Sequence, residues 1–313
     1  MSPGKSSERV TVAGVELTHP ERVLFADQGV TKKRLAEYYE AVRERMFPHL
    51  EGRPVSLVRC PEGQSEDCFY QRHPGPGLAD ALESVELAEK EGIGSYLVIR
   101  EPSDVIVLVQ YGVLEVHPWS CLADRPDRPD RLIFDLDPGA GVKWSVVRQA
   151  ARDAHRRLEA LGLESFVRTS GGKGLHVVAP LVRRNSWEEV HEFARAVAAS
   201  LVAEEPDDYT TQAAKEKRKG KVYLDYLRNS RGATAIASYS TRARPGAPVA
   251  TPLGWGELDG IDGGDAFDLD AAEERMTGAD PWKGFFTLQQ SVSAARLRRA
   301  RAAAGWAFTD SEE

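Results

Sequence analysis

Two segments of the chain alternate apolar and other residues with a period of two, and both contain aspartates. In RLIFDLDPG (131–139), the apolar residues from Leu132 onward fall on one face of an extended strand, and Asp135 and Asp137 share the other face, about 7 Å apart. In KVYLDYL (221–227), Asp225 lies in a second strand of the same kind. Because strand interiors disfavour aspartate, these segments predict strands whose carboxylates have a functional role.

The paired carboxylates of the first segment indicate a divalent cation. Two like charges on one strand face repel each other, and a buried carboxylate without a partner is costly. A hard cation removes both problems, and Mg²⁺ typically takes one or two carboxylates together with substrate phosphates. The alternative for Asp135 and Asp137 is a hydrated strand end. The apolar run before them favours the metal site.

Composition limits the class of protein. With 313 residues, 42% of them hydrophobic, the chain is long enough for two subdomains or one large α/β domain. It has no apolar run of the ~20 residues that a membrane span needs, and the segment MSPGKSSERV has no apolar export region. We therefore expect no membrane partner and a cytoplasmic location.

The cysteines point the same way. Cys60, Cys68 and Cys121 cannot all pair with one another, and their spacing does not resemble a disulfide framework. A zinc site is disfavoured because Cys60, Cys68 and His73 include no C-x₂-C pair. We expect buried thiols in a reducing compartment.

Charge is distributed unevenly. The net charge of −7 argues weakly against a nucleic-acid ligand. However, residues 210–244 contain nine Lys or Arg and only two acidic residues, and Asp225 lies within this basic segment. A local positive surface can bind polyanions whatever the total charge. The acidic segment 257–280 is interpreted as a solvated face.

A glycine-rich turn, SGGKGLH (170–176), lies between two apolar strand patterns. Its glycines allow backbone N–H groups to approach an anion closely, and Lys173 adds a positive charge. Ser170 offers a hydroxyl group, and His176 begins the second strand. The turn is neither a P-loop nor a dinucleotide fingerprint, but it favours phosphate binding.

Other elements are predicted from periodicity and capping. Residues 11–17 form a strand pattern, Thr31 is a candidate N-cap, and residues 144–158 trace an amphipathic helix that ends near Gly162. Ser186 and Glu189 form a capping box for the next helix. Residues 103–119 fit either a strand or a helix. The basic residues 296–301 predict a solvated terminal helix.

A metal triad, a phosphate turn and a basic surface together suit nucleotidyl transfer, in which two cations stabilise an in-line displacement. At these residues the chain resembles a known family. LIFDLDPG, RTSGGKGLHVVAPL, the run from VYLDYLRNSRG to PLGWGEL, and GVLEVHPW are similar to the polymerase domain of bacterial ligase D (LigD), of the archaeo-eukaryotic primase superfamily. The resemblance covers roughly residues 11 to 290.

The resemblance implies a DNA-end- or gap-directed polymerase of bacterial non-homologous end joining, with ribonucleotides and manganese preferred. It implies two Mn²⁺ or Mg²⁺ ions and a nucleoside triphosphate (NTP or dNTP) as substrate. The residues that match the family's site fall into two groups. The metal ligands are Asp135, Asp137 and Asp225, with His117 as a catalytic residue near the sugar. The nucleotide contacts are Ser170, Lys173, His176, Arg218 and Arg242.

The resemblance also implies a device for recognising DNA ends. A pocket for a downstream 5′-phosphate matches Arg22 and Lys32, with His19 beside them. Family members often have asparagine at the position of His19 and lysine at that of Arg22; arginine can bind phosphate in a bidentate manner. Phe69 and Tyr70 match an aromatic pair that stacks on the template. One of these two rings could instead be a half-buried strand residue.

The predicted fold is α/β: a two-module primase-polymerase fold with mixed or antiparallel sheets, one half resembling an RNA-recognition motif, and a catalytic cleft between the modules. Three modules are predicted. Residues 1–130 recognise 5′-phosphate and template, with Arg59 among the residues involved. Residues 131–290 are catalytic, and residues 291–313 form a basic helix and tail. The predicted partners are gapped or 3′-overhang DNA with a downstream 5′-phosphate, Ku and a DNA ligase, in a cytoplasmic, nucleoid-associated setting.

Two alternatives stay open at this point. A haloacid-dehalogenase-type phosphohydrolase also ends an apolar strand in D-x-D and would use Asp135 as a nucleophile, although such enzymes follow it with Gly-Thr or Gly-Val rather than Pro-Gly. A DNA end-binding module without catalysis is the second alternative. It is disfavoured because three carboxylates near DNA would weaken binding. Whether the chain is a stand-alone protein or part of a larger ligase is not readable from the sequence.

Overall fold

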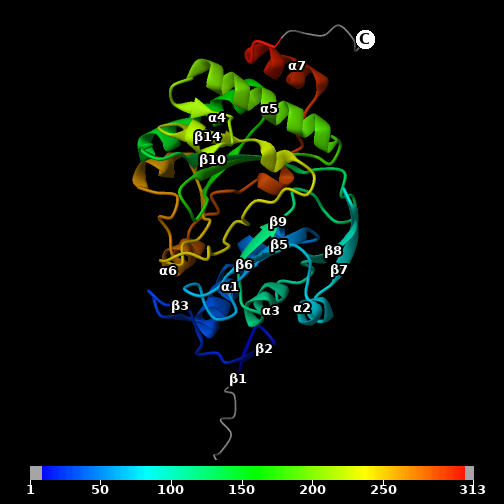
Figure 1. The fold of residues 1–313 in the computed structure, drawn as a ribbon, viewed down its shortest axis with the longest axis vertical. Coiled ribbons are helices and arrows are strands. Elements are labelled where there is room, and N and C mark those ends of the chain that lie inside the picture. The colour runs from blue at the N-terminus through cyan, green and yellow to red at the C-terminus, as the bar shows by residue number, and fades with distance from the viewer. Residues whose placement is uncertain (1–8, 307–313) are drawn as a thin grey trace, which may run out of the picture. The chain divides into compact units, whose positions relative to one another are not determined.

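The computed structural model describes residues 9–306, and these divide into two compact units (Figure 1). Unit 1 contains residues up to 118 together with the segments 236–250 and 267–280. Unit 2 contains residues 119–235, 251–266 and 281 onward. Both units combine helices with mainly antiparallel strands, which confirms the predicted α/β class. The sequence predicts a module boundary at residue 130, whereas the first division between the units falls after Pro118. The chain then returns to unit 1 twice, in the segments 236–250 and 267–280.

Unit 1 is built on a five-stranded antiparallel sheet. Its order is β6-β5-β8-β7, and β9 pairs with β5 from Val55 to Arg59. The strands are β5 (Pro54–Arg59), β6 (Phe69–Gln71), β7 (Ser84–Glu89), β8 (Gly92–Val98) and β9 (Val113–Pro118), and two hairpins precede them, β1 (Arg9–Val12) with β2 (Val15–Thr18) and β3 (Val23–Phe25) with β4 (Val30–Thr31). The helices are α1 (Lys32–Met46), α2 (Pro76–Ala81), α3 (Asp104–Gln110) and α6 (Leu269–Glu274).

Several local predictions for unit 1 can be compared with the structure. Thr31 caps α1, because its side chain accepts a hydrogen bond from the Arg34 amide. The predicted strand over 11–17 is instead a hairpin that turns at residues 13 and 14. The ambiguous segment 103–119 contains both predicted elements. Helix α3 ends at Gln110, the chain turns at Gly112, whose φ of 73° suits glycine, and β9 follows.

Unit 2 is built on a six-stranded sheet in the order β13-β14-β10-β12-β11-β15. Its strands are β10 (Arg131–Pro138), β11 (Phe166–Thr169), β12 (Leu175–Pro180), β13 (Tyr209–Thr210), β14 (Val222–Asp225) and β15 (Pro252–Leu253), and its helices are α4 (Trp144–Ala160), α5 (Trp187–Glu204) and α7 (Ala294–Ala303). The chain runs β10, α4, β11, β12, α5, β14, with β10 next to both β12 and β14. This is a split β-α-β arrangement. Its likeness to an RNA-recognition motif stays a prediction.

Helices α4 and α5 pack against each other and against the sheet of unit 2, and α7 packs on α5 (Figure 1). The Ser186–Glu189 capping box at the start of α5 is confirmed. The predicted basic helix near the C-terminus forms and is largely exposed to solvent, but two of its arginines are partly buried. Arg296 donates hydrogen bonds to the carbonyls of Leu161, Gly162 and Ser291, and Arg301 pairs with Glu192. The tail after residue 306 lies outside the described residues.

The remaining helical segments are short 3₁₀ turns. They are η1 (Phe47–His49), η2 (Lys215–Arg218), η3 (Leu227–Asn229), η4 (Trp255–Gly260), η5 (Arg275–Thr277) and η6 (Phe285–Thr287). Among residues 9–306, no helix is both long enough and apolar enough to cross a bilayer.

Candidate functional site

The two faces of β10 have different environments, as the alternation predicts. Leu132, Phe134 and Leu136 are at most 1% exposed and belong to the core of unit 2. On the opposite face, Ile133 packs in a cluster with Trp282 and Phe285, so only the last part of that face remains for the carboxylates. The aspartates therefore stand at the end of a strand whose first half is fixed by apolar packing.

The strand pairing places four polar residues in one row across the sheet. Asp135 of β10 lies directly opposite Asp225 of β14 on one side and His176 of β12 on the other. His176 in turn lies opposite Arg168 of β11. Since directly opposite side chains share a face and lie within about 5.5 Å at Cβ, residues from four separate strands form one charged row. We call Asp225, Asp135, His176 and Arg168, together with Asp137, the carboxylate row.

Hydrogen bonds within the row indicate which ring nitrogen of His176 carries the proton. The Arg168 guanidinium donates to Nδ1 of His176 at 3.1 Å, so Nδ1 is an acceptor and the ring proton of neutral His176 is on Nε2. That Nε2 lies 3.4 Å from Oδ1 of Asp135. Burial lowers the pKa of His176 despite the nearby Asp135, and burial also lowers the pKa of Arg168 to about 9. Arg168 therefore fixes the imidazole in the orientation that points at Asp135.

Two arginines bind the carboxylates of the row. The Nη2 atom of Arg228 lies 3.0 Å from Oδ2 of Asp135, and its Nε lies 3.3 Å from Oδ2 of Asp225. Arg218 donates from Nη1 to Oδ2 of Asp137 at 3.0 Å. Burial by itself would raise the pKa of Asp135, but His176 and Arg228 outweigh burial and lower it. Asp135 is therefore ionised.

The other two aspartates behave differently. Burial and the negative charge of Asp135 raise the pKa of Asp137, although Arg218 opposes the shift. Burial likewise raises the pKa of Asp225, with Asp135 adding to the shift and Arg228 opposing it. The groups in contact with these two carboxylates thus do not fully compensate their burial and mutual repulsion, and an additional cation would stabilise both.

The row fits a divalent cation by its donor set. In this part of the chain, within residues 9–306, no three His, Cys, Asp or Glu side chains are grouped as a ready metal cage. The carboxylate oxygens instead bind Arg228 and Arg218. The donors are nevertheless three carboxylates, two on β10 and one on the neighbouring strand β14. Carboxylates are the ligands that Mg²⁺ and Mn²⁺ take. Asp135, Asp137 and Asp225 are the residues that would hold such ions.

The glycine-rich turn joins β11 to β12 next to the row. Ser170 closes the turn, because its Oγ accepts hydrogen bonds from the amides of Gly172 and Gly174, each at 3.2 Å. A Cβ at Gly174 would collide with the carbonyl of Leu136, so glycine is required where the turn lies against β10. The Lys173 side chain is exposed. The predicted phosphate turn is thus held in close contact with the strand that carries Asp135 and Asp137.

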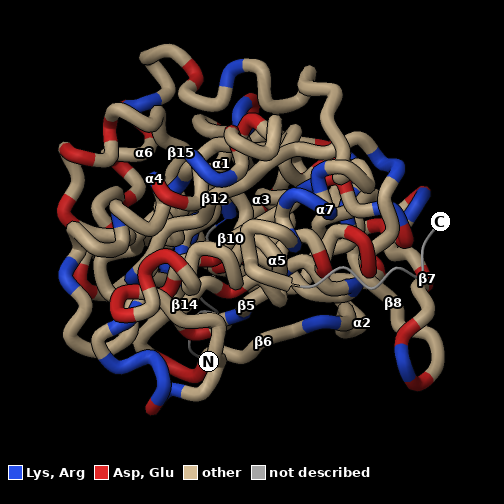
Figure 2. The backbone as a smooth tube through the Cα atoms, turned by 90° about the horizontal axis from the view of Figure 1, so that it is seen from above, with Lys and Arg blue, Asp and Glu red and all other residues tan. Residues whose placement is uncertain are grey.

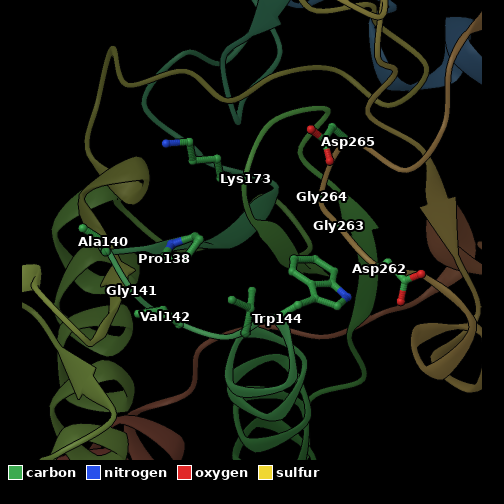
Figure 3. Close-up of a pocket in the computed structure, with 12 residues that line it drawn as sticks. Pro138, Ala140, Gly141, Val142, Trp144, Lys173, Asp262, Gly263, Gly264 and Asp265 are labelled. Atoms are coloured by element: carbon green, nitrogen blue, oxygen red, sulfur yellow. The ribbon is translucent and has the colours of Figure 1, made fainter.

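A cavity of about 400 Å³ opens on the same turn (Figure 3). Lys173 and the segment 138–142, which follows the carboxylates of β10, line it from two sides. Trp144 and Val147 of α4 and the segment 262–265 complete the lining. Figure 3 shows Lys173 and Asp265 reaching in from different segments. The cavity offers room for a polar group beside Lys173.

The predicted basic segment leads into β14. Figure 2 shows Lys and Arg along the backbone that approaches this strand, and η2 contributes Lys215, Lys217 and Arg218. The Arg218 guanidinium lies over the ring of Tyr223 at 3.8 Å, which fixes its direction toward Asp137. The Arg218 side chain is therefore held in place by its contacts with Tyr223 and Asp137.

Unit 1 contains a second buried acidic group. His117 of β9 donates from Nε2 to Glu115 at 2.8 Å, and Nε of Arg242 lies 3.0 Å from the same carboxylate. The Ala243 amide also donates to Glu115. Burial would raise the pKa of Glu115, but His117 and Arg242 lower it to about 2. The structure thus joins two predicted site residues, His117 and Arg242, through a carboxylate that the prediction lacked.

Three further predicted residues lie on neighbouring strands of unit 1. Phe69 and Tyr70 of β6 are 47% and 52% exposed, so about half of each ring faces the surface. The Arg59 guanidinium lies 5.6 Å from the centre of the Phe69 ring and donates to Gln71 and to the Tyr111 carbonyl. Such a surface suits base stacking.

The residues matched to a 5′-phosphate pocket are also neighbours. The Lys32 amide donates to the Arg22 carbonyl, and the Arg22 amide donates to the carbonyl of His19, whose φ is 53°. The Lys32 ammonium is 5% exposed and donates to the carbonyls of Thr18 and Gln110. Burial and Arg22 lower its pKa. Arg22 binds Glu62 and the Pro61 carbonyl.

The cysteine prediction is wrong for two of the three residues. Cys60 and Cys68 form a disulfide, with their Cα atoms 4.3 Å apart. The reason is the register of β5 and β6: Arg59 pairs with Phe69, so the two cysteines are the next residues on facing strands. Pairing between strands, rather than a spacing pattern, brought them together. Cys121 is buried and is not part of the disulfide, as predicted.

Sequence reasoning missed three residues that the site uses: Glu115, Arg168 and Arg228. Glu115 is two residues before His117, so the alternation in LEVHP places both on one strand face. Arg168 follows the same rule in the strand FVRTS. Arg228 is three residues after Asp225, but nothing in the sequence shows that its side chain turns back toward two carboxylates.

A row of carboxylates beside a glycine- and lysine-containing turn is suited to phosphoryl chemistry on nucleotides. Comparison with known proteins agrees with that class, a polymerase of the nucleotidyltransferase type. The family described as "LigD, primase-polymerase domain" matches residues 31–282. The chain belongs to this LigD primase-polymerase family.

Individual relatives support the same assignment. The chain is 36% identical over 296 residues to a multifunctional non-homologous end joining protein LigD of Pseudomonas aeruginosa, covering 94% of this chain and 35% of that protein. A bifunctional LigD of Bacillus subtilis is 28% identical over 264 residues, 84% of this chain and 42% of that protein. The chain thus spans about a third of the length of its first relative.

A solved structure matches as well. The polymerase domain of ligase D from Mycobacterium tuberculosis, in complex with DNA, superposes with a TM-score of 0.80 at 31% identity, over 87% of this chain and 98% of that one. The correspondence over nearly all of that domain confirms the predicted family and the mixed α/β fold.

Proposed function

We propose that this chain adds nucleotides to primer 3′-hydroxyl groups at DNA ends or gaps, in bacterial non-homologous end joining or gap repair. The observation that supports this most strongly is the register of the carboxylate row, in which Asp135 lies opposite Asp225 and beside the Lys173 turn. Family membership gives the reaction class. The DNA in the Mycobacterium tuberculosis structure supports DNA as the partner.

In the proposed reaction, Asp135, Asp137 and Asp225 hold two Mn²⁺ or Mg²⁺ ions. When bound, these ions neutralise phosphate charge and lower the pKa of the primer hydroxyl. Ser170, Lys173 and His176, together with Arg218, hold and orient the triphosphate. The 3′-oxygen bonds to the α-phosphorus as the bond to pyrophosphate breaks, and the hydroxyl proton passes to solvent. No strong side-chain base is needed.

The residues of unit 1 recognise sugar and DNA in this proposal. His117, fixed by Glu115, contacts the sugar of the incoming nucleotide, and Arg242 contacts its phosphates. Phe69 and Tyr70 stack on the template base, with Arg59 on the same path. Arg22, Lys32 and His19 take a downstream 5′-phosphate. We further propose a preference for ribonucleotides, Ku and a DNA ligase as partners, and a cytoplasmic, nucleoid-associated location.

The test is extension of a gapped DNA primer by the purified chain with MnCl₂ and either NTPs or dNTPs. We expect template-dependent addition that favours NTPs and that Asp137→Ala removes. Unchanged extension by Asp137→Ala would overturn the metal assignment. Phosphatase turnover without extension would support the phosphohydrolase alternative, and DNA binding with neither activity would support a non-catalytic end-binding module.

A further inference from the structure

We infer that Arg228 is the cation shared by Asp135 and Asp225 before metal binds, and that it competes with the metal for these two carboxylates. This inference rests on the proposed function, because it concerns the same carboxylates. It adds a positioning residue that controls metal affinity and the stability of the metal-free protein.

The first argument is that one guanidinium joins two strands. Arg228 contacts Oδ2 of Asp135 through Nη2 at 3.0 Å and through Nε at 3.1 Å, and the same Nε lies 3.3 Å from Oδ2 of Asp225. These are the two carboxylates that face each other in register. A single positive charge therefore relieves repulsion between aspartates of β10 and β14.

The second argument is that the Oδ1 atoms of Asp135 and Asp225 have partners that are buried or belong to the backbone. Oδ1 of Asp135 faces His176, whose side chain is 4% exposed and is held by Arg168. Oδ1 of Asp225 accepts the Leu227 amide at 2.9 Å, a backbone contact that shapes η3. The Arg228 side chain, by contrast, is 39% exposed. A metal that binds both aspartates would therefore displace Arg228 rather than the other partners.

The third argument is that the backbone of Arg228 is fixed, while its side chain is partly exposed and has, besides the two carboxylates, a 3.3 Å contact from Nη1 to the Thr234 carbonyl. The Asn229 side chain donates to the Ile133 carbonyl at 2.7 Å and accepts from the Ile133 amide at 2.8 Å. This pair clamps η3 to β10. Arg228 is thus held next to the row by its neighbour, and only its side chain needs to rotate when the carboxylates take a metal.

The experiment measures Mn²⁺ binding without nucleotide or DNA, by electron paramagnetic resonance of free Mn²⁺, together with thermal unfolding. In Arg228→Gln we expect Mn²⁺ affinity to rise about tenfold, since a competing cation is gone. We also expect a lower unfolding temperature without metal and a larger rise of that temperature on adding Mn²⁺. Arg228→Lys, which keeps the charge but cannot bridge both carboxylates as a fork, should lie between these values.

Arg231→Gln is the matched control. It removes the same charge three residues further along the chain, but Arg231 pairs with Asp127 instead of with the row. We expect it to change Mn²⁺ affinity less than twofold. Equal effects of Arg228→Gln and Arg231→Gln, or weaker Mn²⁺ binding by Arg228→Gln, would overturn the inference. Asp225→Asn separates the two proposals: if it leaves Mn²⁺ binding unchanged, the metal assignment itself fails.

Discussion

The carboxylate row of unit 2 and the Glu115 cluster of unit 1 use the same groups to different effect. In each, a buried carboxylate binds one histidine and one arginine: Asp135 binds His176 and Arg228, and Glu115 binds His117 and Arg242. Glu115 is a single carboxylate, and its partners lower its pKa to about 2. Its charge is fully compensated by the protein itself.

The row differs because it contains three carboxylates. Asp135 has a lowered pKa, but its charge contributes to the raised pKa values of Asp137 and Asp225. A cluster that is balanced internally gains little from a ligand, whereas a cluster with uncompensated carboxylates gains from a cation. The comparison teaches that the number of carboxylates, rather than their burial or their partners, separates a cluster that would bind a cation from one whose charges are already balanced.

The largest expected effect is on nucleotide addition. Asp225→Asn removes one carboxylate from the row but keeps its shape, so we expect extension of a gapped primer to fall by about 10³-fold, as when a preorganised charge contact is lost. Primer extension and circular dichroism check activity and fold. Glu115→Gln is the control in the other cluster, and we expect a smaller loss from it. An equal loss of primer extension in Asp225→Asn and Glu115→Gln would contradict the proposed difference between the two clusters.

The next effect is on stability in acid. The pKa of Glu115 is about 2 in the folded chain against an ordinary 4.5, so its ionised form stabilises the fold above pH 4.5. That stabilisation, about 3 kcal/mol, is lost as the pH falls from 4.5 through 2. Urea unfolding at a series of pH values should show the loss in the wild type. Glu115→Gln should lack this part of the pH dependence, and a parallel profile would contradict the cluster as described.

The smallest expected effect extends the comparison to cations. The Lys32 ammonium is buried on protein carbonyls, whereas Lys173 is exposed on its turn. We expect Lys32→Ala to weaken binding to gaps with a downstream 5′-phosphate about tenfold, and to unphosphorylated gaps less. Fluorescence anisotropy with both DNAs measures this. Lys173→Ala should not discriminate between them, and equal losses in Lys32→Ala would reduce Lys32 to a general electrostatic role.

Much of the site could be predicted because it depends on local pattern. Alternation in RLIFDLDPG placed Asp135 and Asp137 on one face, and glycines at 171, 172 and 174 marked the phosphate turn. The same local rules predicted the caps at Thr31 and Ser186. They could not show that Cys60 and Cys68 pair, because their proximity follows from the register of β5 and β6.

The sequence by itself determined which residues share a strand face, since side-chain direction in a strand depends only on position along the chain. It also carried the family, through motifs in a fixed order. Only the tertiary structure decided that Asp225, Asp135, His176 and Arg168 lie in one row and that Arg228 bridges two of them. The physical reason is that strand register and side-chain rotation depend on packing between distant segments, such as Asp135 and Asp225, which are 90 residues apart, and no local pattern encodes those contacts.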